Sequence, residues 1–205
     1  MKLFYTPGAC SLAPHIAIRE GGLQADLAKV DLGKKLLEDG SDYRAVNPKG
    51  YVPALALDDG SLLTEAAALL QYLADKAPAG KLRPERDTPA YYTYLEWLTF
   101  VSSEMHKGFG PLWKPDTPAE VRTATIARLN ERFGWLDRHL ADRPYLNGGS
   151  FTAADAYLFT VLSWAPMLKV DLAAYPNVTA FVARMRDRPA VQAALSEEGL
   201  LKQAA

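Results

Sequence analysis

The chain has 205 residues, of which 49% are hydrophobic and 23% are charged, and its formal net charge is −1. These proportions are typical of a globular protein with one large or two small domains, and they exclude a disordered, collagen-like or coiled-coil chain. The near-zero charge excludes the basic surface that binders of nucleic acid or anionic membranes usually carry, so we expect neither as a partner.

The first eighty residues predict an α/β unit of short strands and helices. Pro7 and Gly8 separate the first strand from the first helix, which Gly21 and Gly22 end. An Asp-Gly turn separates the last two strands, which therefore form a hairpin. The predicted strands cover residues 2–5, 26–32, 52–57 and 61–64, and the predicted helices cover 11–20, 34–44 (short and irregular) and 65–76.

The chain after residue 84 is predicted to be all helical. Pro89 stands at an early helical position, and Thr152-Ala-Ala-Asp155 is a variant of the capping box that starts another helix. The predicted helices run from 88 to about 110, from 118 to about 140, and onward from 152, 175 and 189. The Pro/Gly-containing stretch at 77–80 therefore divides the chain into predicted domains at 1–80 and 85–205.

The single cysteine, Cys10, lies between the first strand and the first helix. One thiol excludes an internal disulfide and any site made of several thiolates. Free N–H groups at a helix start favour a thiolate, so this position predicts a lowered thiol pKa; a small buried, unreactive cysteine is the alternative. Ala13 stands where a CxxC motif needs its second cysteine, so redox chemistry at Cys10 would require a thiol from outside the chain.

The three histidines, His15, His106 and His139, lie far apart without a metal-binding spacing, so we expect no metal site. The N-terminus lacks the apolar stretch of a signal peptide, and no segment has the apolar length of a membrane span. We therefore expect a cytoplasmic protein, in which a lone thiol stays reduced.

Two segments of the α/β unit have the features of a peptide-binding site. Val52-Pro53 opens a predicted strand; a cis proline there would let the Val52 backbone pair with a bound peptide, whereas an ordinary trans proline is the alternative. Glu65 and the N–H of Ala66 match the ammonium and carboxylate ends of an amino acid. A favourable charge in the first turn of a helix is the alternative for Glu65.

The first long helix of the second domain carries a polar stripe in an otherwise apolar and aromatic segment. Thr99, Ser103, His106 and Lys107 share one face of this helix. The stripe is either a solvated face or part of a site. His106 is the best candidate for proton transfer or for a hydrogen bond to a thiolate, because an imidazole titrates near neutral pH.

Several of these segments carry a resemblance to a known family. They read MKLFYTPGACS at 1–11, NPKGYVP at 47–53, LTEA at 63–66 and EWLTFVSSEMHK at 96–107, with the capping element TAAD at 152–155. In this order and spacing the chain resembles the cytosolic glutathione transferases, and within them the bacterial beta class, over essentially its whole length.

The resemblance implies a thioredoxin-like α/β domain at 1–80 that binds glutathione. It implies an all-α domain at 85–205 with an electrophile pocket and dimer contacts. It further implies a cis bond before Pro53, a homodimer, and glutathione as co-substrate with no prosthetic group.

The resemblance also implies roles for individual residues. Cys10 and His106 would be catalytic, with Cys10 contacting the glutathione sulfur and able to form a mixed disulfide with it. The segment 99–106 would reach across from the partner subunit. The implied glutathione-binding residues are Cys10, Lys35, Val52, Pro53, Glu65, Ala66, Thr99, Ser103, Glu104, Met105 and His106.

Two positions depart from the family pattern: Ala66 stands where a serine is usual, and Thr99 where an asparagine is usual. Ala66 keeps its N–H but lacks a hydroxyl hydrogen bond to a charged carboxylate, worth roughly 1.5–3 kcal/mol when buried. Weakened glutathione binding is expected.

The expected function is conjugation of the glutathione thiolate to small hydrophobic electrophiles, a detoxification reaction. Two alternatives stay open at this point. One is thiol–disulfide exchange through a Cys10–glutathione mixed disulfide, and the other is a non-catalytic ligand-binding protein.

Overall fold

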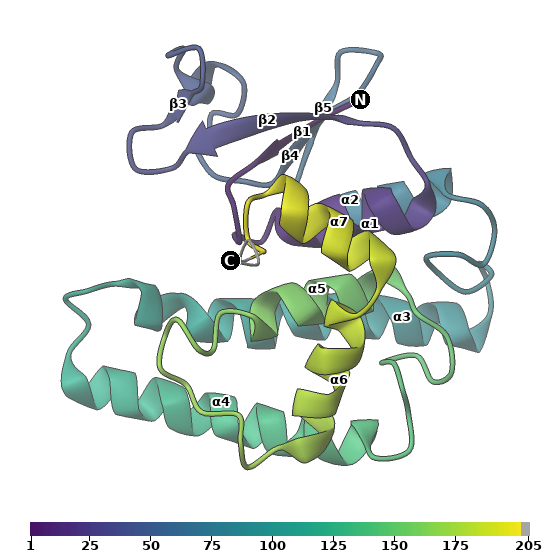
Figure 1. The fold of residues 1–205 in the computed structure, drawn as a ribbon, viewed down its shortest axis with the longest axis vertical. Helices are drawn as coiled ribbons and strands as arrows, with labels where there is room; N and C mark the ends of the chain where they lie inside the picture. The colour runs from purple at the N-terminus through teal and green to yellow at the C-terminus, as the bar shows by residue number, and fades with distance from the viewer. Residues whose placement is uncertain (202–205) are drawn as a thin grey trace.

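The computed structural model describes residues 1–201, which form a small mixed sheet and a layer of helices beneath it (Figure 1). The strands are β1 (Lys2–Tyr5), β2 (Asp26–Asp31), β3 (Leu36–Leu37), β4 (Ala54–Ala56) and β5 (Leu62–Thr64). Their order in the sheet is β3-β2-β1-β4-β5, with β1 and β2 parallel and the other neighbours antiparallel. The central position of β1 suits its run of buried residues, since a strand covered on both faces needs no polar alternation.

Seven α-helices lie within the described residues. They are α1 (Leu12–Gly21), α2 (Ala66–Lys76), α3 (Pro89–Phe100), α4 (Ala119–Leu140), α5 (Ala153–Leu162), α6 (Pro176–Arg186) and α7 (Pro189–Glu197). The pair α1 and α2 lies between the sheet and the helical layer (Figure 1). One hydrophobic core extends from the sheet through this pair to α5, every residue of which is buried. A helix buried on all sides is expected to be apolar around its whole circumference.

The first long helix of the helical layer changes its winding. The sequence predicts one helix from 88 to about 110, and the structure has an α-helix only to Phe100. A π-helical segment, η2 (Val101–His106), and a 3₁₀ segment, η3 (Lys107–Trp113), follow it. Such π segments are rare and occur often at functional sites, because they rotate side chains out of the regular helical stripe.

The predicted helix over 34–44 is wrong. Leu36 and Leu37 instead form β3, which pairs with the end of β2, and a 3₁₀ turn, η1 (Tyr43–Ala45), follows. Lys35 has a φ of 60°, which is incompatible with a continuing right-handed helix. Sheet pairing therefore outweighs the local helical preference of this segment.

The other predicted strands and helices are present, with ends that shift by a few residues. The sequence of an α/β unit followed by helices alone is confirmed, and the Val52–Pro53 bond is cis as expected. The domain limits at 80 and 85 stay predictions, and residues 202–205 of the second predicted domain lie outside the described residues. Within residues 1–201, no helix combines the length and the hydropathy that crossing a membrane would require.

Candidate functional site

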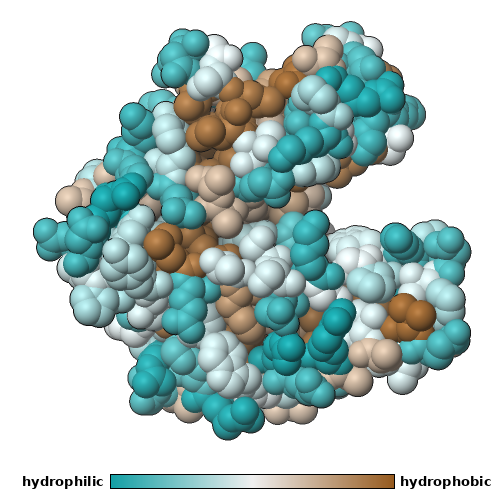
Figure 2. Space-filling view, turned by 180° about the vertical axis from the view of Figure 1, so that it is seen from behind, coloured by the Kyte–Doolittle hydropathy of each residue, from teal (hydrophilic) through white to brown (hydrophobic). Residues whose placement is uncertain are grey.

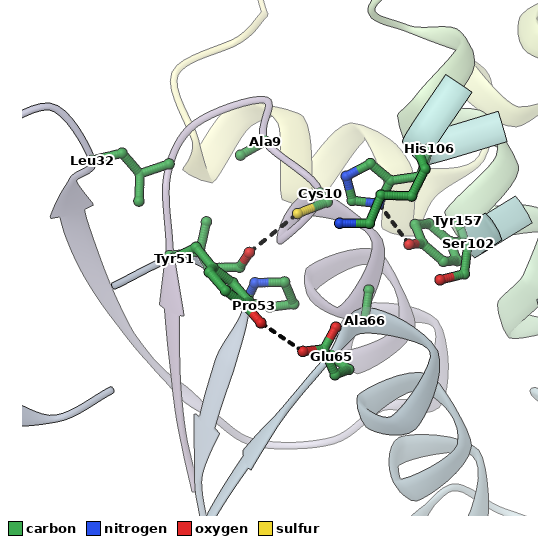
Figure 3. A pocket seen from close by; sticks show the side chains of 12 residues that line it. Ala9, Cys10, Leu32, Tyr51, Pro53, Glu65, Ala66, Ser102, His106 and Tyr157 are labelled. Atoms are coloured by element: carbon green, nitrogen blue, oxygen red, sulfur yellow. Dashed lines mark hydrogen bonds between the residues drawn. The ribbon is translucent and has the colours of Figure 1, made fainter. Parts of the chain in front are cut away.

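A cleft opens between the sheet and the helical layer (Figure 2). It contains a cavity of about 320 Å³, which we call the inner cavity. Figure 3 shows the side chains that line it, contributed by the loop after β1, the start of β4, the start of α2, the η2 segment and α5. The cavity brings together six residues that the sequence predicted for the site: Cys10, Val52, Pro53, Glu65, Ala66 and His106.

Cys10 lies in the loop between β1 and α1, and its thiol donates a hydrogen bond to the carbonyl oxygen of Val52 at 3.2 Å. Burial raises the pKa of Cys10 to about 12; nearby backbone N–H groups and the positive charge of Lys107 oppose this rise without cancelling it. The predicted lowering of the thiol pKa is therefore wrong, since desolvation outweighs the helix start. Cys10 is a neutral thiol at neutral pH.

Two side chains from the C-terminal half of the chain hold the loop that carries Cys10. Glu198 accepts a hydrogen bond from the Gly8 N–H at 2.8 Å, and the indole Nε1 of Trp164 donates to the Gly8 carbonyl at 2.8 Å. Gly8 has a φ of 72°, which a glycine adopts without the steric penalty of a side chain. The other oxygen of Glu198 lies 2.9 Å from Nδ1 of buried His15 on α1. The loop is therefore anchored by both of its polar backbone groups at Gly8.

Glu65 stands at the N-terminus of α2 with a φ of 71°, a backbone conformation that non-glycine residues rarely adopt. Its Oε1 accepts hydrogen bonds from Lys49 Nζ and from the Tyr51 hydroxyl, each at 2.7 Å. These two contacts lower the pKa of Glu65 below its usual value, so the side chain stays a carboxylate. Its Oε2 has no hydrogen-bond partner within residues 1–201.

His106, the last residue of η2, points into the inner cavity near Cys10 (Figure 3). Its Nδ1 lies 2.7 Å from the hydroxyl oxygen of Tyr157 on α5. Burial, with a smaller contribution from Lys107, lowers the pKa of His106 to about 4, and burial raises the pKa of Tyr157 well above its usual value. Both groups are neutral at neutral pH. We assign the Tyr157 O–H as the donor to Nδ1, an arrangement that places the His106 proton on Nε2, where it can donate into the cavity.

A second cavity of about 410 Å³, here called the outer cavity, adjoins the first. Cys10 and His106 line both cavities. The rest of the outer cavity is largely apolar, with Trp113, Trp164 and the exposed Met167 in its wall. The His106 and Trp164 rings meet edge to face with centroids 5.0 Å apart. The two catalytic candidates therefore stand where a polar and an apolar compartment meet.

Five predicted site residues do not line the inner cavity of their own chain. Thr99 and Ser103 are exposed residues whose hydroxyls donate to main-chain carbonyls one helical turn earlier. Glu104 forms an ion pair with Arg132. Met105 is fully buried in the core, so its side chain takes no part in the cavity.

Lys35 also does not line the inner cavity. His106 was expected to reach across from a partner subunit with the rest of its segment, but it lines the cavity of its own chain.

Sequence reasoning missed six residues that line the inner cavity or hold Glu65: Ala9, Leu32, Lys49, Tyr51, Ser102 and Tyr157. Lys49 and Tyr51 lie inside the NPKGYVP segment, so their proximity to Val52 was a usable signal. Tyr157 lies on a different helix from His106, and no local pattern connects the two. Among residues 1–201, no three His, Cys, Asp or Glu side chains cluster as metal ligands would.

Two family models match the chain: the N-terminal domain of glutathione S-transferase over residues 8–76 and the C-terminal domain of glutathione S-transferase over residues 100–189. Glutathione S-transferase GstA of Escherichia coli O157:H7 is 52% identical over 98% of this chain and 100% of its own.

Two solved structures, each 46% identical with a TM-score of 0.93, match 98% of this chain and 100% of theirs. They are a sphingomonad glutathione S-transferase complexed with glutathione and a bacterial beta class glutathione S-transferase of Sphingomonas chungbukensis.

Proposed function

The chain belongs to the glutathione S-transferase family, in its bacterial beta class, and from this premise we propose that it conjugates glutathione to small hydrophobic electrophiles. One observation carries the proposal. Cys10 and His106 stand at the junction of the inner cavity, which offers charged and main-chain partners, and the outer cavity, which is apolar. A thiol held in the first and an electrophile held in the second would meet at this junction.

The inner cavity fits the γ-glutamyl and cysteinyl parts of glutathione. The free Oε2 of Glu65 suits the α-ammonium group, and the first N–H groups of α2, beginning at Ala66, suit the α-carboxylate. The backbone of Val52 suits pairing with the cysteinyl residue, which places the sulfur beside Cys10. Lys35 is proposed for the glycine carboxylate. Ala66 offers no hydroxyl to the α-carboxylate, so we expect weaker binding than a serine would give.

Catalysis requires that the site stabilise the glutathione thiolate more than the thiol. Cys10 and His106 are both neutral at neutral pH, and each carries a proton for a sulfur anion; the Cys10 S–H turns from the Val52 carbonyl oxygen to donate it. The positive charge of Lys107, which lines the same cavity, adds a favourable electrostatic term. The thiol proton is released to solvent water, and the thiolate attacks the electrophilic carbon: the C–S bond forms, and the electron pair of the broken bond leaves with the leaving group or moves into an adjacent acceptor.

Burial of the Cys10 thiol disfavours the redox alternative. Disulfide exchange through Cys10 needs its thiolate as the nucleophile, and a thiol with a pKa of about 12 supplies almost none at neutral pH. We therefore assign Cys10 as a hydrogen-bond donor to the glutathione sulfur, in preference to a nucleophile.

We also propose a homodimer. Trp97, Phe100 and Trp135 form an aromatic cluster on α3 and α4, with ring centroids 5.0–5.8 Å apart. Trp135 is 41% exposed, and Tyr92 on the same helix as Trp97 is 60% exposed. A second copy covering α3 and α4 would bury the exposed rings of Trp135 and Tyr92 and bring its Thr99, Ser103 and Glu104 toward a neighbouring cleft. We also propose a cytoplasmic location, because the Cys10 thiol stays reduced in that compartment.

Initial rates with glutathione and an activated aryl chloride test the proposed reaction. We expect saturation in both substrates and conjugation that survives the Cys10→Ala substitution with a reduced rate. Disulfide reductase activity above conjugation activity, lost on the same substitution, would support the redox alternative. Calorimetry that detects no glutathione binding at millimolar concentration would support the non-catalytic one.

A further inference from the structure

The described surface holds a third hollow next to the outer cavity, which we call the side groove. It has a volume of about 480 Å³ and lies between β2, β3 and the turn after β1. Most of its wall is apolar, formed by Pro7, Val30, Leu32, Leu36 and Leu37. A wall of this kind binds uncharged hydrocarbon, in the way that apolar ligand pockets generally do.

The side groove adjoins the outer cavity. Thr6, Pro7 and Leu32 line both hollows, and Leu32 also lines the inner cavity. A ligand whose reactive end lies beside Cys10 can therefore extend past Leu32 into the side groove without leaving an apolar surface. Charged Lys29, Asp31 and Glu38 also line the groove. The net negative charge of these three side chains disfavours an anionic end group there.

Leu36 supplies an independent observation. It is a half-buried leucine in β3, yet it packs against neither of the two hydrophobic clusters of the described residues. Its neighbour Leu37 packs against the smaller cluster, as expected for a core side chain. The side chain of Leu36 therefore presents apolar surface to the groove that the fold itself does not use.

We propose that the side groove is a second apolar compartment for the electrophile, which binds the uncharged, unbranched tail of an elongated substrate whose reactive end lies beside Cys10. This inference rests on the proposed conjugation of glutathione and specifies its substrate class. Short electrophiles fill the outer cavity alone, and longer ones gain affinity from Leu32, Leu36 and Leu37. The class is therefore an electrophile at the end of a long hydrocarbon chain, in addition to compact aromatic rings.

S-alkylglutathiones of increasing chain length, from S-methyl to S-decyl, test the proposal by titration calorimetry, since they need no turnover. In the native protein we expect the affinity to rise by up to about fourfold for each buried methylene group, and to go on rising for the longest members. In Leu36→Ser, we expect unchanged affinity for S-methylglutathione and an affinity for S-decylglutathione lowered by about tenfold.

The control is Val121→Ser, which makes the same kind of aliphatic-to-serine change at a more exposed position on α4 that lines none of the three hollows. It should leave the whole series unchanged. Two results in Leu36→Ser would overturn the proposal: an equal loss of affinity at every chain length, or no loss at any. A third is a loss of affinity for S-decylglutathione in Met167→Ser but not in Leu36→Ser, which would place the tail in the outer cavity. Failure of S-methylglutathione itself to bind overturns the proposed function, and a preference for an ω-carboxylate tail overturns the uncharged class.

Discussion

The hydroxyl of Tyr157 lies 2.7 Å from Nδ1 of His106, so that a residue of α5 fixes the orientation of the imidazole that faces Cys10. The bond joins η2 and α5, two neighbouring segments on the helical side of the cleft. A Tyr157 hydroxyl that donates to Nδ1 leaves Nε2 as the atom that can donate a hydrogen bond to a bound sulfur.

Removing the hydroxyl in Tyr157→Phe should lower kcat for conjugation by about tenfold, with little change in the KM for glutathione, because the imidazole loses its fixed tautomer. Nitrogen NMR of His106 should show a single Nε2–H tautomer in the native protein and a mixture in the variant. Tyr94→Phe is the control, since Tyr94 is equally buried and its hydroxyl has no partner within residues 1–201. Similar kcat losses in both variants would contradict the assigned role.

The raised pKa of Cys10 predicts slow alkylation of the free protein at neutral pH. The sign follows from the reacting species: only the thiolate attacks iodoacetamide, and its fraction grows as the pH approaches the pKa from below. The rate, followed by mass spectrometry, should rise by about tenfold per pH unit without a plateau up to at least about pH 10. An alkylation rate that levels off near neutral pH would mean that the N–H groups at the helix start lower the pKa of Cys10 more than burial raises it.

Lys49 and Tyr51 should act on glutathione affinity by holding Oε1 of Glu65. Lys49→Met and Tyr51→Phe should each raise the KM for glutathione by about two- to fivefold at unchanged kcat, a modest effect because both contacts are half exposed. Lys49→Arg keeps the positive charge and should therefore leave the KM for glutathione at its native value. Lys76→Met, a lysine outside the site, is the matched control.

Glutaryl-cysteinylglycine, which lacks the α-ammonium group, gives this prediction a second readout. Its binding should be weak and equally weak in native protein and variants, because it offers nothing to Glu65. If the ratio of the affinities for glutathione and glutaryl-cysteinylglycine stays the same in the Lys49 and Tyr51 variants, these residues do not act through the contact of Glu65 with the ammonium group.

The start of α5 depends on buried Asp155, whose carboxylate accepts hydrogen bonds from the N–H groups of Leu146 and Thr152 and from the Thr152 hydroxyl. Asp155→Ala leaves these donors without a partner and should lower the free energy of unfolding by about 2–3 kcal/mol. Denaturant titration of Asp155→Ala, Thr152→Ala and the double variant measures this. If the losses in the free energy of unfolding of the two single variants add up to that of the double variant, Thr152 and Asp155 do not share a capping box.

The exposed aromatic face on α3 and α4 predicts a dimer that a single charge disrupts. Trp135→Glu should sediment as a monomer at micromolar concentration, because a carboxylate would be buried at the interface. Trp113→Glu, which changes an exposed tryptophan of the outer cavity, should remain dimeric. A native protein that sediments as a monomer would remove the cross-subunit roles of Thr99, Ser103 and Glu104.

Local signals were sufficient for most of the fold. The Asp59-Gly60 turn, Pro89 at a helix start and the Thr152–Asp155 capping box each act within a few residues, and each element appears where its signal stands. The segment 34–44 failed because its conformation is set by pairing with β2, which no short pattern encodes. The π-helical winding at Val101–His106 was missed for a different reason: its residues also fit an α-helix, so no local pattern distinguishes the two.

The site was predictable to the extent that its residues lie in contiguous motifs. Cys10 follows β1, Val52 precedes β4 and Glu65 follows β5. These positions lie at the same end of the sheet, where the structure brings the three residues together. The reactivity of Cys10 was not predictable, because burial is a property of the folded chain and here outweighs the helix start. Tyr157 was invisible for a comparable reason: its partner lies on another helix.

The anchoring of Gly8 by Trp164 and Glu198 has a consequence for synthesis on the ribosome. The two side chains that fix the loop of Cys10 emerge more than 150 residues after the loop itself. A nascent chain can therefore form its sheet hairpin long before the thiol has a defined place. The loop of Cys10 gains its two anchoring hydrogen bonds only after Trp164 and Glu198 have been synthesised.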